Sequence, residues 1–367
     1  MKQIVLLGAT GYAGGLVLSA LLGRGLRPVL AGSNPQKLAA LAAAHGGLPF
    51  QVADATDLAS VRSLVGPGDV LITTVGPFQQ LGVTVARAAA EQGAHYIDST
   101  GEVDFSRLIT SRHHQQAKAA GAVMLSAFGN DYVPGFLAAG HAIQEGGPKV
   151  QALEIGYFID GSLNGGKGLS QGTRKTAAEG LLEPVLERSH GRLVRRRAGS
   201  RTQTFHAGGK RKAAVLASGT EVLYLTNDFP QVQSVSVYNG WFPSTSRIMP
   251  ALSLALSALR RTEIGTRAVK SILSRTVGPA GGPDADERSL TGARTVAIAK
   301  DSAGQTLAEV QVAGPNVYDL TGELMAWAAE KLARGEFANS GVISPIEAFG
   351  FDDLVQGCRE LGLVRTR

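Results

Sequence analysis

The sequence predicts an α/β protein in which a doubly wound parallel sheet is joined to a second, α+β domain. Short apolar runs rich in β-branched residues alternate with helical patterns over about the first 129 residues, as crossovers between parallel strands require. A glycine-rich turn follows the first of these runs. Beyond about residue 129, strand-like runs predominate. A chain of 367 residues, 44% hydrophobic, is long enough for two domains.

Each apolar run of the first domain is followed by a helical pattern. The predicted strands are "IVLL", "RPVLAGSN", "FQVADATD", "DVLITTVGPF", "HYIDSTGE" and "AVMLSAFGND". The predicted helices cover residues 13–25, 38–46, 57–64, 82–93 and 104–120. Ligands of such sheets bind at the carboxyl ends of the strands. The residues expected there are Asp54, Val75 to Phe78, Ser99 to Glu102, and Asn130 to Tyr132.

The turn "GATGYAG", residues 8–14, lies between the first strand and the first helix. Glycines at this point let the backbone approach a ligand, and the start of the helix presents free N–H groups and a positive dipole end to a phosphate. This context is typical of a Rossmann-type dinucleotide site, although a turn that merely packs is the alternative. The expected cofactor-binding residues of the turn are Gly8, Thr10, Gly11, Tyr12, Ala13 and Gly14.

The second strand indicates which dinucleotide binds. An NAD site usually has an acidic residue about 20 positions beyond the glycines, but no Asp or Glu precedes Asp54. Ser33, Asn34 and Lys37 follow the second strand instead, with Arg24 and Arg27 nearby in sequence. Such donors and cations suit a 2′-phosphate, so we predict NADP (NADPH); ordinary solvated loop residues are the alternative.

Composition excludes several other classes. The single cysteine, Cys358, excludes a disulfide framework, and no His, Asp or Glu recurs at metal-ligand spacing, so no metal is expected. We expect a cytoplasmic protein without a secretory signal or transmembrane segment. A net charge of +6 over 367 residues is too dilute for nucleic-acid binding. The apolar run at 248–259 could lie on a membrane surface, but covering the core is the favoured interpretation.

The second domain is expected to hold a mixed or antiparallel sheet with helices on one face. Its predicted strands cover residues 150–161, 219–227, 232–241, 293–301 and 306–314. One long helix is predicted at 170–188, a basic helical pair after Ser246, and a helix at 318–335 that leads back to the first domain. The predicted boundaries are 1–129 for the nucleotide-binding domain, with 336–367 packing onto it, and 130–335 for the substrate domain.

Four segments carry a family resemblance: "GATGYAG", "LAGSN", "TTVGPFQQLGVTVARAAAEQGAHYIDSTGE" and "GVISPIEAFGFDDLVQGCRELGL". They resemble the saccharopine dehydrogenase-like reductases, in particular the group with trans-acting enoyl reductases of polyketide assembly. The resemblance implies an NADP-dependent oxidoreductase of secondary metabolism that transfers a hydride from NADPH to an enoyl thioester. It also implies that the following residues line the cofactor cleft: Val75, Gly76, Pro77, Phe78, Asp98, Thr100, Gly101 and Glu102.

Hydride transfer needs a proton donor where the acceptor gains negative charge. We expect Tyr132 and Lys167 to be candidate donors, with Asp131 orienting one of them. Packing for Tyr132, solvation for Lys167 and helix capping for Asp131 are the alternatives. Ser170 and Thr173 either direct N–H groups toward an acyl carbonyl or cap a helix. An imine reductase or amine dehydrogenase, and a non-catalytic NADP-binding sensor or scaffold, are the alternative functions.

A basic strip, residues 191–215, holds eight Lys and Arg residues and no carboxylate. An acidic acyl carrier protein or the phosphates of coenzyme A would be attracted to it, and a solvated hairpin is the alternative. The expected partner is therefore a small-molecule or carrier-tethered acyl substrate. A homodimer is one possible assembly.

Overall fold

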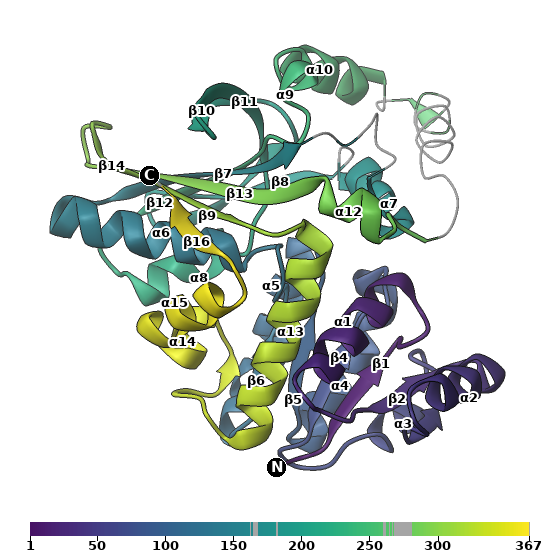
Figure 1. Ribbon diagram of the computed structural model, residues 1–367. Helices are drawn as coiled ribbons and strands as arrows, with labels where there is room; N and C mark the ends of the chain where they lie inside the picture. The colour runs from purple at the N-terminus through teal and green to yellow at the C-terminus, as the bar shows by residue number, and fades with distance from the viewer. Residues whose placement is uncertain are drawn as a thin grey trace. The chain divides into compact units, whose positions relative to one another are not determined.

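The computed structural model describes residues 1–161, 163, 168–180, 183–259, 262, 263, 265, 267 and 281–366, without the side chains of 176–179. Figure 1 shows the chain, which divides into two compact units. Unit 1 comprises Met1–Val133 and Val317–Leu361, and unit 2 comprises Pro134–Asn316 and Gly362–Arg367. Each unit is built around its own sheet.

Unit 1 contains a seven-stranded sheet in the order β15-β6-β5-β4-β1-β2-β3, with every pair parallel. The chain leaves β1 toward β2 and β3 and then crosses to β4, β5 and β6 on the other side. This order confirms the predicted Rossmann-type doubly wound sheet, whose direction of winding reverses between β1 and β4. The strands are β1 (Ile4–Leu7), β2 (Val29–Gly32), β3 (Phe50–Val52), β4 (Val70–Thr73), β5 (His95–Asp98), β6 (Val123–Leu125) and β15 (Gly341–Val342).

Helices connect these strands and bury their apolar faces against the sheet. They are α1 (Tyr12–Gly23), α2 (Pro35–Ala44), α3 (Leu58–Arg62), the π-helix η1 (Phe78–Gly82), α4 (Val83–Gln92), α5 (Val103–Ala119), α13 (Val317–Arg334), α14 (Pro345–Phe349) and α15 (Phe351–Glu360). Helix α13 packs closely on α1, because a Cβ on Gly322 would lie 3.1 Å from the backbone of Leu16. Cys358 is buried in α15, and burial raises its pKa to about 12, so it is a packing residue.

The division between units lies elsewhere than the predicted boundaries. Helix α13 belongs to unit 1, which the chain therefore re-enters at Val317 rather than near residue 336, because its buried face packs on α1 and the sheet. After α15 the chain leaves unit 1 and enters unit 2 a second time. The last strand, β16 (Val364–Thr366), pairs antiparallel with β14 of unit 2. Residues 362–367 thus belong to unit 2.

Unit 2 contains a mixed sheet in the order β10-β11-β12-β7-β13-β14-β16, with β8 paired to β12 and β9. Only β7 and β12 are parallel neighbours among the described pairs. This sheet confirms a second α+β domain. Its strands are β7 (Ala152–Gly161), β8 (Pro184–Ser189), β9 (Arg192–Arg197), β10 (Thr202–Ala207), β11 (Lys210–Ala217), β12 (Ser234–Asn239), β13 (Thr291–Lys300) and β14 (Thr306–Gly314).

Short helices accompany this sheet: α6 (Val133–Gly146), the 3-10 turn η2 (Gly147–Lys149), α7 (Gln171–Gly180), α8 (Glu221–Asp228), α9 (Pro243–Ser246), α10 (Met249–Leu259) and α12 (Ala285–Ser289). Three buried rings, Phe158, Phe205 and Tyr238, form an edge-to-face cluster with neighbouring centroids 5.6 Å apart. Two predicted elements of this unit are wrong, the long helix at 170–188 and the strand at 219–227.

The predicted helix at 170–188 is a helix followed by a strand. Helix α7 ends at Gly180, and β8 begins at Pro184, whose ring cannot continue a helix. Strand β8 then pairs antiparallel with β9 around a turn in which His190 and Gly191 have φ angles of 48° and 76°. Two positive φ values fit the right-handed twist of a tight hairpin.

The predicted strand at 219–227 is helix α8. Val222 and Leu225 are fully buried on it, and the carboxylate of Glu221 in its first turn accepts a hydrogen bond of 2.6 Å from the Tyr157 hydroxyl. Valine, tyrosine and threonine favour a strand by propensity, but these tertiary contacts select the helix.

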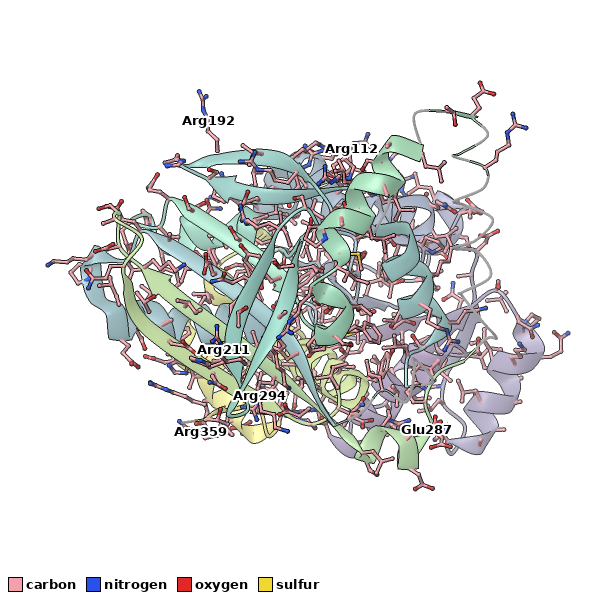
Figure 2. The ribbon with its side chains drawn as sticks, turned by 90° about the horizontal axis from the view of Figure 1, so that it is seen from above. Arg112, Arg192, Arg211, Glu287, Arg294 and Arg359 are labelled. Carbon is pink, nitrogen blue, oxygen red and sulfur yellow. The ribbon has the colours of Figure 1, made fainter. Side chains whose placement is uncertain are left out.

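The basic strip forms β9, β10 and β11, and several of its cations have partners. Arg196 and Arg201 both pair with Glu187 of β8, which is buried, and Lys212 pairs with Asp160 of β7 at 3.3 Å. Three of the eight cations therefore have counter-charges outside the strip. The carboxylates were not recognised because they lie outside the strip in sequence. Arg192 extends from the surface (Figure 2), and Arg211 is exposed.

Candidate nucleotide-binding site

The glycine turn brings β1 and α1 into close contact. A Cβ on Gly14 would lie 2.1 Å from the carbonyl oxygen of Gly8, a distance that no side chain tolerates. Gly8 has a φ of +91°, and a Cβ there would lie 2.7 Å from Thr74 Oγ1 and 2.9 Å from Val75 Cγ2. The turn after β1 therefore lies directly against the turn after β4, at the point where the sheet reverses its winding.

The start of α1 can receive an anion. Gly11 precedes the helix in an extended conformation without a capping side chain, and the first turn holds no acidic residue. The first N–H groups of a helix have no partner within it, so this end carries a partial positive charge. Thr10 and Gly11 are exposed, and the ring of Tyr12 is held edge-on to Tyr318 of α13 at 5.5 Å. The geometry suits a pyrophosphate.

Ser33, Asn34 and Lys37 lie together and exposed after β2. Asn34 Oδ1 accepts the backbone N–H of Lys37 at 2.9 Å and so caps α2. The Asn34 amide group, the Ser33 hydroxyl and the Lys37 ammonium are donors that could meet a phosphate at this helix start.

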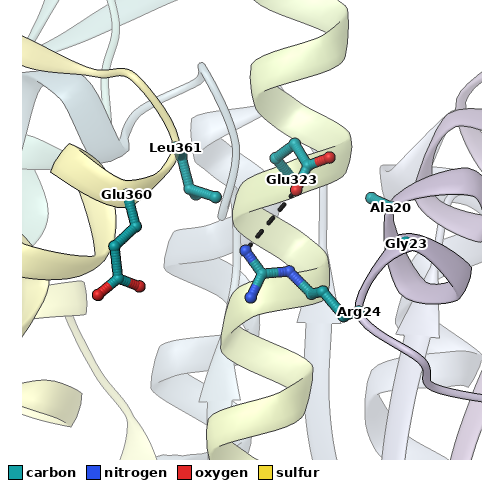
Figure 3. A pocket seen from close by; sticks show the side chains of 6 residues that line it. All are labelled: Ala20, Gly23, Arg24, Glu323, Glu360 and Leu361. Carbon is teal, nitrogen blue, oxygen red and sulfur yellow. Dashed lines mark ion pairs between the residues drawn. The ribbon is translucent and has the colours of Figure 1, made fainter.

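The expected support from Arg24 and Arg27 is wrong. Arg24 pairs with Glu330 at 3.0 Å and with Glu323 at 3.7 Å, both on α13. Figure 3 shows the pair with Glu323. Arg27 donates to the carbonyl of Gly46 at 3.0 Å. The carboxylate partners of Arg24 lie about 300 residues further along the chain, too far to be inferred from local sequence.

A pocket of about 530 Å³ surrounds Arg24, and its lining includes Ala20, Gly23 and Glu360. It lies at the C-terminal end of α1, whereas the glycine turn lies at the N-terminal end. This pocket is therefore separate from the dinucleotide site.

Asp54 follows β3, two strands from β1. Its Oδ1 accepts the N–H of Thr56 at 2.8 Å and the Thr56 hydroxyl at 2.7 Å. These hydrogen bonds hold the pKa of Asp54 below its usual range. The residue thus stabilises its own turn and keeps a negative charge beside the strand ends.

Glu102 joins the turn after β4 to the loop after β5. Its Oε1 accepts the N–H of Phe78 at 2.8 Å, and its Oε2 accepts the N–H of Gln79 at 3.0 Å. The carboxylate thereby caps η1, which follows the cis Gly76–Pro77 peptide. Thr100 Oγ1 accepts the N–H of Glu102 at 3.0 Å and orients the same loop. The Val75–Phe78 turn and the Asp98–Glu102 loop, which the resemblance implies line the cofactor cleft, are thus joined by hydrogen bonds.

Asp98, at the end of β5, joins the loop after β5 to the loop after β6. Its Oδ1 accepts the N–H groups of Thr100 and Ala127, each at 2.9 Å, and the whole carboxylate is buried. Burial raises the pKa of Asp98 to about 6, against the opposing effects of the two N–H groups and of the Ser126 and Tyr96 hydroxyls. Ala127 has a φ of 59°, unusual for alanine, so the carboxylate holds a tightly bent chain.

Tyr132 lies at the end of that bent loop. Its hydroxyl donates to the carbonyl of Gly101 at 3.2 Å, and its side chain is buried. Asp131 precedes it through a cis peptide bond, and desolvation raises the pKa of Asp131 to about 6. The structure therefore places the hydroxyl of one candidate proton donor, Tyr132, beside Gly101, within unit 1.

The remaining candidates lie elsewhere. Lys167 lies outside the described residues. Ser170 and Thr173 belong to unit 2, where the N–H of Thr173 donates to Ser170 Oγ at 3.2 Å, as in the helix-capping alternative. No group of three potential metal ligands occurs in the part of the chain that the structure describes.

One contact that holds the site together was not predicted from the sequence. Thr321 of α13 accepts the N–H of Asn130 at 3.0 Å, and a Cβ on Gly129 would lie 2.7 Å from its methyl carbon. Helix α13 thus holds the loop that carries Asp131 and Tyr132. No local signal identifies Thr321, because it is 191 residues away along the chain.

The site combines four chain turns, after β1, β4, β5 and β6, that converge at the carboxyl ends of neighbouring strands. Residues 4–125 match the family model of the saccharopine dehydrogenase NADP binding domain, which confirms the resemblance and the predicted cofactor. The match covers the glycine turn, Ser33 to Lys37 and the loop of Glu102.

Two similar proteins are the trans-acting enoyl reductases of Mycobacterium ulcerans (strain Agy99) and Mycobacterium leprae (strain TN). The first is 38% identical over 145 residues, or 38% of this chain and 35% of the relative, and the second 39% over 138 residues, or 36% and 33%. The chain thus spans about a third of the length of these relatives.

Among solved structures, the apo saccharopine dehydrogenase (L-Glu forming) of Saccharomyces cerevisiae has a TM-score of 0.63 at 12% identity. The likeness covers 100% of this chain and 99% of the yeast chain. At this identity the likeness extends to the fold alone.

Proposed function

We propose that this chain, which carries a saccharopine dehydrogenase-type NADP-binding domain at residues 4–125, is an NADP-dependent oxidoreductase that reduces an enoyl thioester. One observation carries the proposal. The glycine turn touches the turn after β4, Glu102 fastens that turn to the loop after β5, and Asp98 fastens the loop after β5 to the loop after β6. Such a crevice at the reversal of a parallel sheet is where dinucleotides bind.

The residues present fit NADPH. The N-terminus of α1 would hold the pyrophosphate, and Ser33, Asn34 and Lys37 would hold the 2′-phosphate. The turn at Val75 to Phe78 would lie along the nicotinamide half, together with Thr100 and Gly101. When bound, NADPH supplies a hydride, and the protein's part is to hold the acceptor against it and exclude water.

The enoyl thioester is favoured because the two relatives described above are named trans-acting enoyl reductases. In this reduction the β-carbon of the conjugated double bond gains a hydride, and the α-carbon gains a proton. The products are the saturated acyl thioester and NADP. Two groups of this chain are therefore needed, one to polarise the thioester carbonyl and one to deliver a proton.

Tyr132 is the proposed proton donor, with Asp131 beside it. The Tyr132 hydroxyl bonds a carbonyl in the Thr100–Glu102 loop, so its proton points into the segment proposed to line the nicotinamide. If the Tyr132 hydroxyl released the Gly101 carbonyl and bonded the substrate instead, its proton would be directed to the acceptor. Tyr132→Phe should then lower kcat about 10²-fold while the Kd for NADPH stays unchanged, and a wild-type kcat would remove Tyr132 from the chemistry.

We further propose that the acyl group is tethered to a carrier protein or coenzyme A, in cytoplasmic secondary metabolism. The exposed cations Arg192, Lys210 and Arg211 of the basic strip would attract either anionic carrier. Arg192→Glu combined with Arg211→Glu should raise KM for a tethered substrate without changing that for its short N-acetylcysteamine thioester. An equal effect on both thioesters would contradict this role.

The proposal is tested by NADPH consumption with enoyl thioesters, cyclic imines, and oxo acids supplied with amines. Consumption with enoyl thioesters alone is the expected result. Consumption with imines instead would assign a saccharopine dehydrogenase-like imine reductase. NADPH binding without turnover on any acceptor would favour a sensor or scaffold.

A further inference from the structure

Helix α10 presents its apolar side chains outward and its polar ones inward. Ile248, which precedes it, is 63% exposed, and Leu252, Leu254 and Leu259 are 43%, 58% and 48% exposed. At 100° per residue these four positions and Ala251, Ala255 and Ala258 share one continuous arc of the helix. That arc contains no polar side chain. We call these seven residues the α10 face.

Polar contacts hold the opposite side of the helix against unit 2. Ser253, 5% exposed, donates through its hydroxyl to the carbonyl of Ala198 and accepts from Arg197 Nε at 3.0 Å. Ser257 donates to the Ser253 carbonyl at 2.8 Å. The helix therefore does not cover a core with its leucines, and the favoured interpretation of residues 248–259 is wrong.

The surroundings of the α10 face carry positive charge. Residues 229–262 contain no Asp or Glu, and neither do residues 188–220, which include β9. Arg247, between α9 and α10, is exposed, and Arg197 joins β9 to α10. Trp241 and Phe242, the latter 41% exposed, precede α9.

We propose that the α10 face is a membrane-contact element that lies in the headgroup region of an anionic lipid bilayer. An apolar helix face flanked by arginines and aromatic residues has the chemistry of helices that lie in such an interface. Aromatic side chains partition to headgroup depth, and the arginines bind anionic headgroups. No described helix is long and apolar enough to span a bilayer, so the contact is peripheral.

A second copy of the chain fits this surface less well. Helix α10 has 11 residues and a length of about 16 Å, whereas a stable interface buries roughly 800 Å² on each partner. One such face cannot supply that area, and two copies would bring Arg247 and its neighbours against each other. A bilayer needs no fixed area and compensates the positive charge. The inference is independent of the proposed reduction.

Flotation of the purified full chain with lipid vesicles tests the proposal. The chain should float with vesicles of phosphatidylcholine and phosphatidylglycerol, and much less with phosphatidylcholine alone. Leu252→Gln combined with Leu254→Gln should lower the partition coefficient at least about tenfold. Leu290→Gln is the matched control, because Leu290 is 64% exposed on the same unit but outside the face. Arg247→Gln should lower binding to anionic vesicles about fivefold.

Tryptophan fluorescence reports the depth of contact. The chain has two tryptophans, and Trp327 is buried in unit 1, so Trp327→Phe leaves Trp241 as the single reporter. Emission from Trp241 should shift to shorter wavelength on anionic vesicles and be quenched by lipids brominated near the headgroup.

Three results would overturn the proposal. The wild-type chain could fail to float with anionic vesicles. The glutamine pair and Leu290→Gln could lose binding equally. Sedimentation could show a dimer that Leu252→Gln with Leu254→Gln dissociates, which would assign the face to a second copy.

Discussion

Glu102 caps the backbone at Phe78 with one carboxylate oxygen and at Gln79 with the other, at 2.8 and 3.0 Å. The two segments are 24 residues apart, and this pair of hydrogen bonds aligns the turn after β4 with the loop after β5. The carboxylate therefore shapes the proposed nicotinamide site through the backbone.

Replacing Glu102 should weaken cofactor binding. Glu102→Ala leaves two N–H groups without an acceptor, and we expect the Kd for NADPH to rise about tenfold by calorimetry. Glu102→Gln keeps one acceptor and should have an intermediate effect. Glu309→Gln, on an exposed position of β14, is the control and should leave the Kd unchanged. An unaltered Kd in Glu102→Ala would show that the turn holds without this cap.

The glycine turn offers two adjacent positions with opposite expectations. Gly14→Ala places a Cβ 2.1 Å from the Gly8 oxygen, so α1 must move away from β1. We expect a lower Tm and at least a tenfold loss of NADPH affinity. Gly15→Ala meets nothing within 4 Å and should stabilise α1 by about 0.5–1 kcal/mol. Equal melting temperatures for the two variants would contradict the packing argument.

Discrimination between the dinucleotides should depend on Lys37. We expect NADPH to bind at least about tenfold more tightly than NADH, because donors and no carboxylate follow β2. Lys37→Ala should remove most of that preference and leave NADH affinity unchanged. Arg27→Ala is the control, since its guanidinium bonds the Gly46 carbonyl. Equal affinities of the wild type for the two dinucleotides would refute the assignment of the 2′-phosphate site.

Asp98 should make stability depend on pH. Its pKa is raised from 3.8 to about 6, so between these values the folded chain retains a proton that the unfolded chain has released. The free energy of unfolding therefore falls as pH rises through that window, by at most about 3 kcal/mol from this group. Asp98→Asn keeps the Oδ1 acceptor without titrating. Its stability relative to the wild type should increase from pH 4 to pH 7 in denaturant titrations.

Asp54→Asn provides a contrast of opposite sign. The pKa of Asp54 is lowered by Thr56, so its stabilising contribution is present at neutral pH and lost as pH falls through the acid range. Identical pH profiles for the wild type and Asp98→Asn would show that Asp98 does not titrate in the folded chain as expected.

The parallel sheet could be predicted because its signals are local. Six of the seven strands of unit 1 correspond to predicted apolar runs, and Gly8, Gly11 and Gly14 mark the turn by spacing alone. The two-residue strand β15 was not predicted. Arrangements that depend on distant partners could not be predicted. Arg24 is satisfied by Glu330, 306 residues along the chain, and the counter-charges of the basic strip lie on β7 and β8.

The two wrong elements of unit 2 have different origins. The hairpin of β8 and β9 had a local signal in His190-Gly191, a dipeptide suited to positive φ, which the helical pattern of the preceding residues outweighed. Helix α8 had none, because its first turn depends on the Tyr157 hydroxyl, 64 residues away. The buried face of α10 likewise depends on Ala198 and Arg197, which no helical periodicity reveals.

Isotope transfer tests the central claim, NADPH-dependent reduction of an enoyl thioester, most directly. The chain would be incubated with NADPH deuterated at the transferable C4 position and an enoyl thioester, and the product examined by mass spectrometry. We predict a saturated thioester with one deuterium on the β-carbon, and loss of this product in Gly14→Ala. Unreduced thioester, or a saturated product without deuterium from NADPH, would contradict the account.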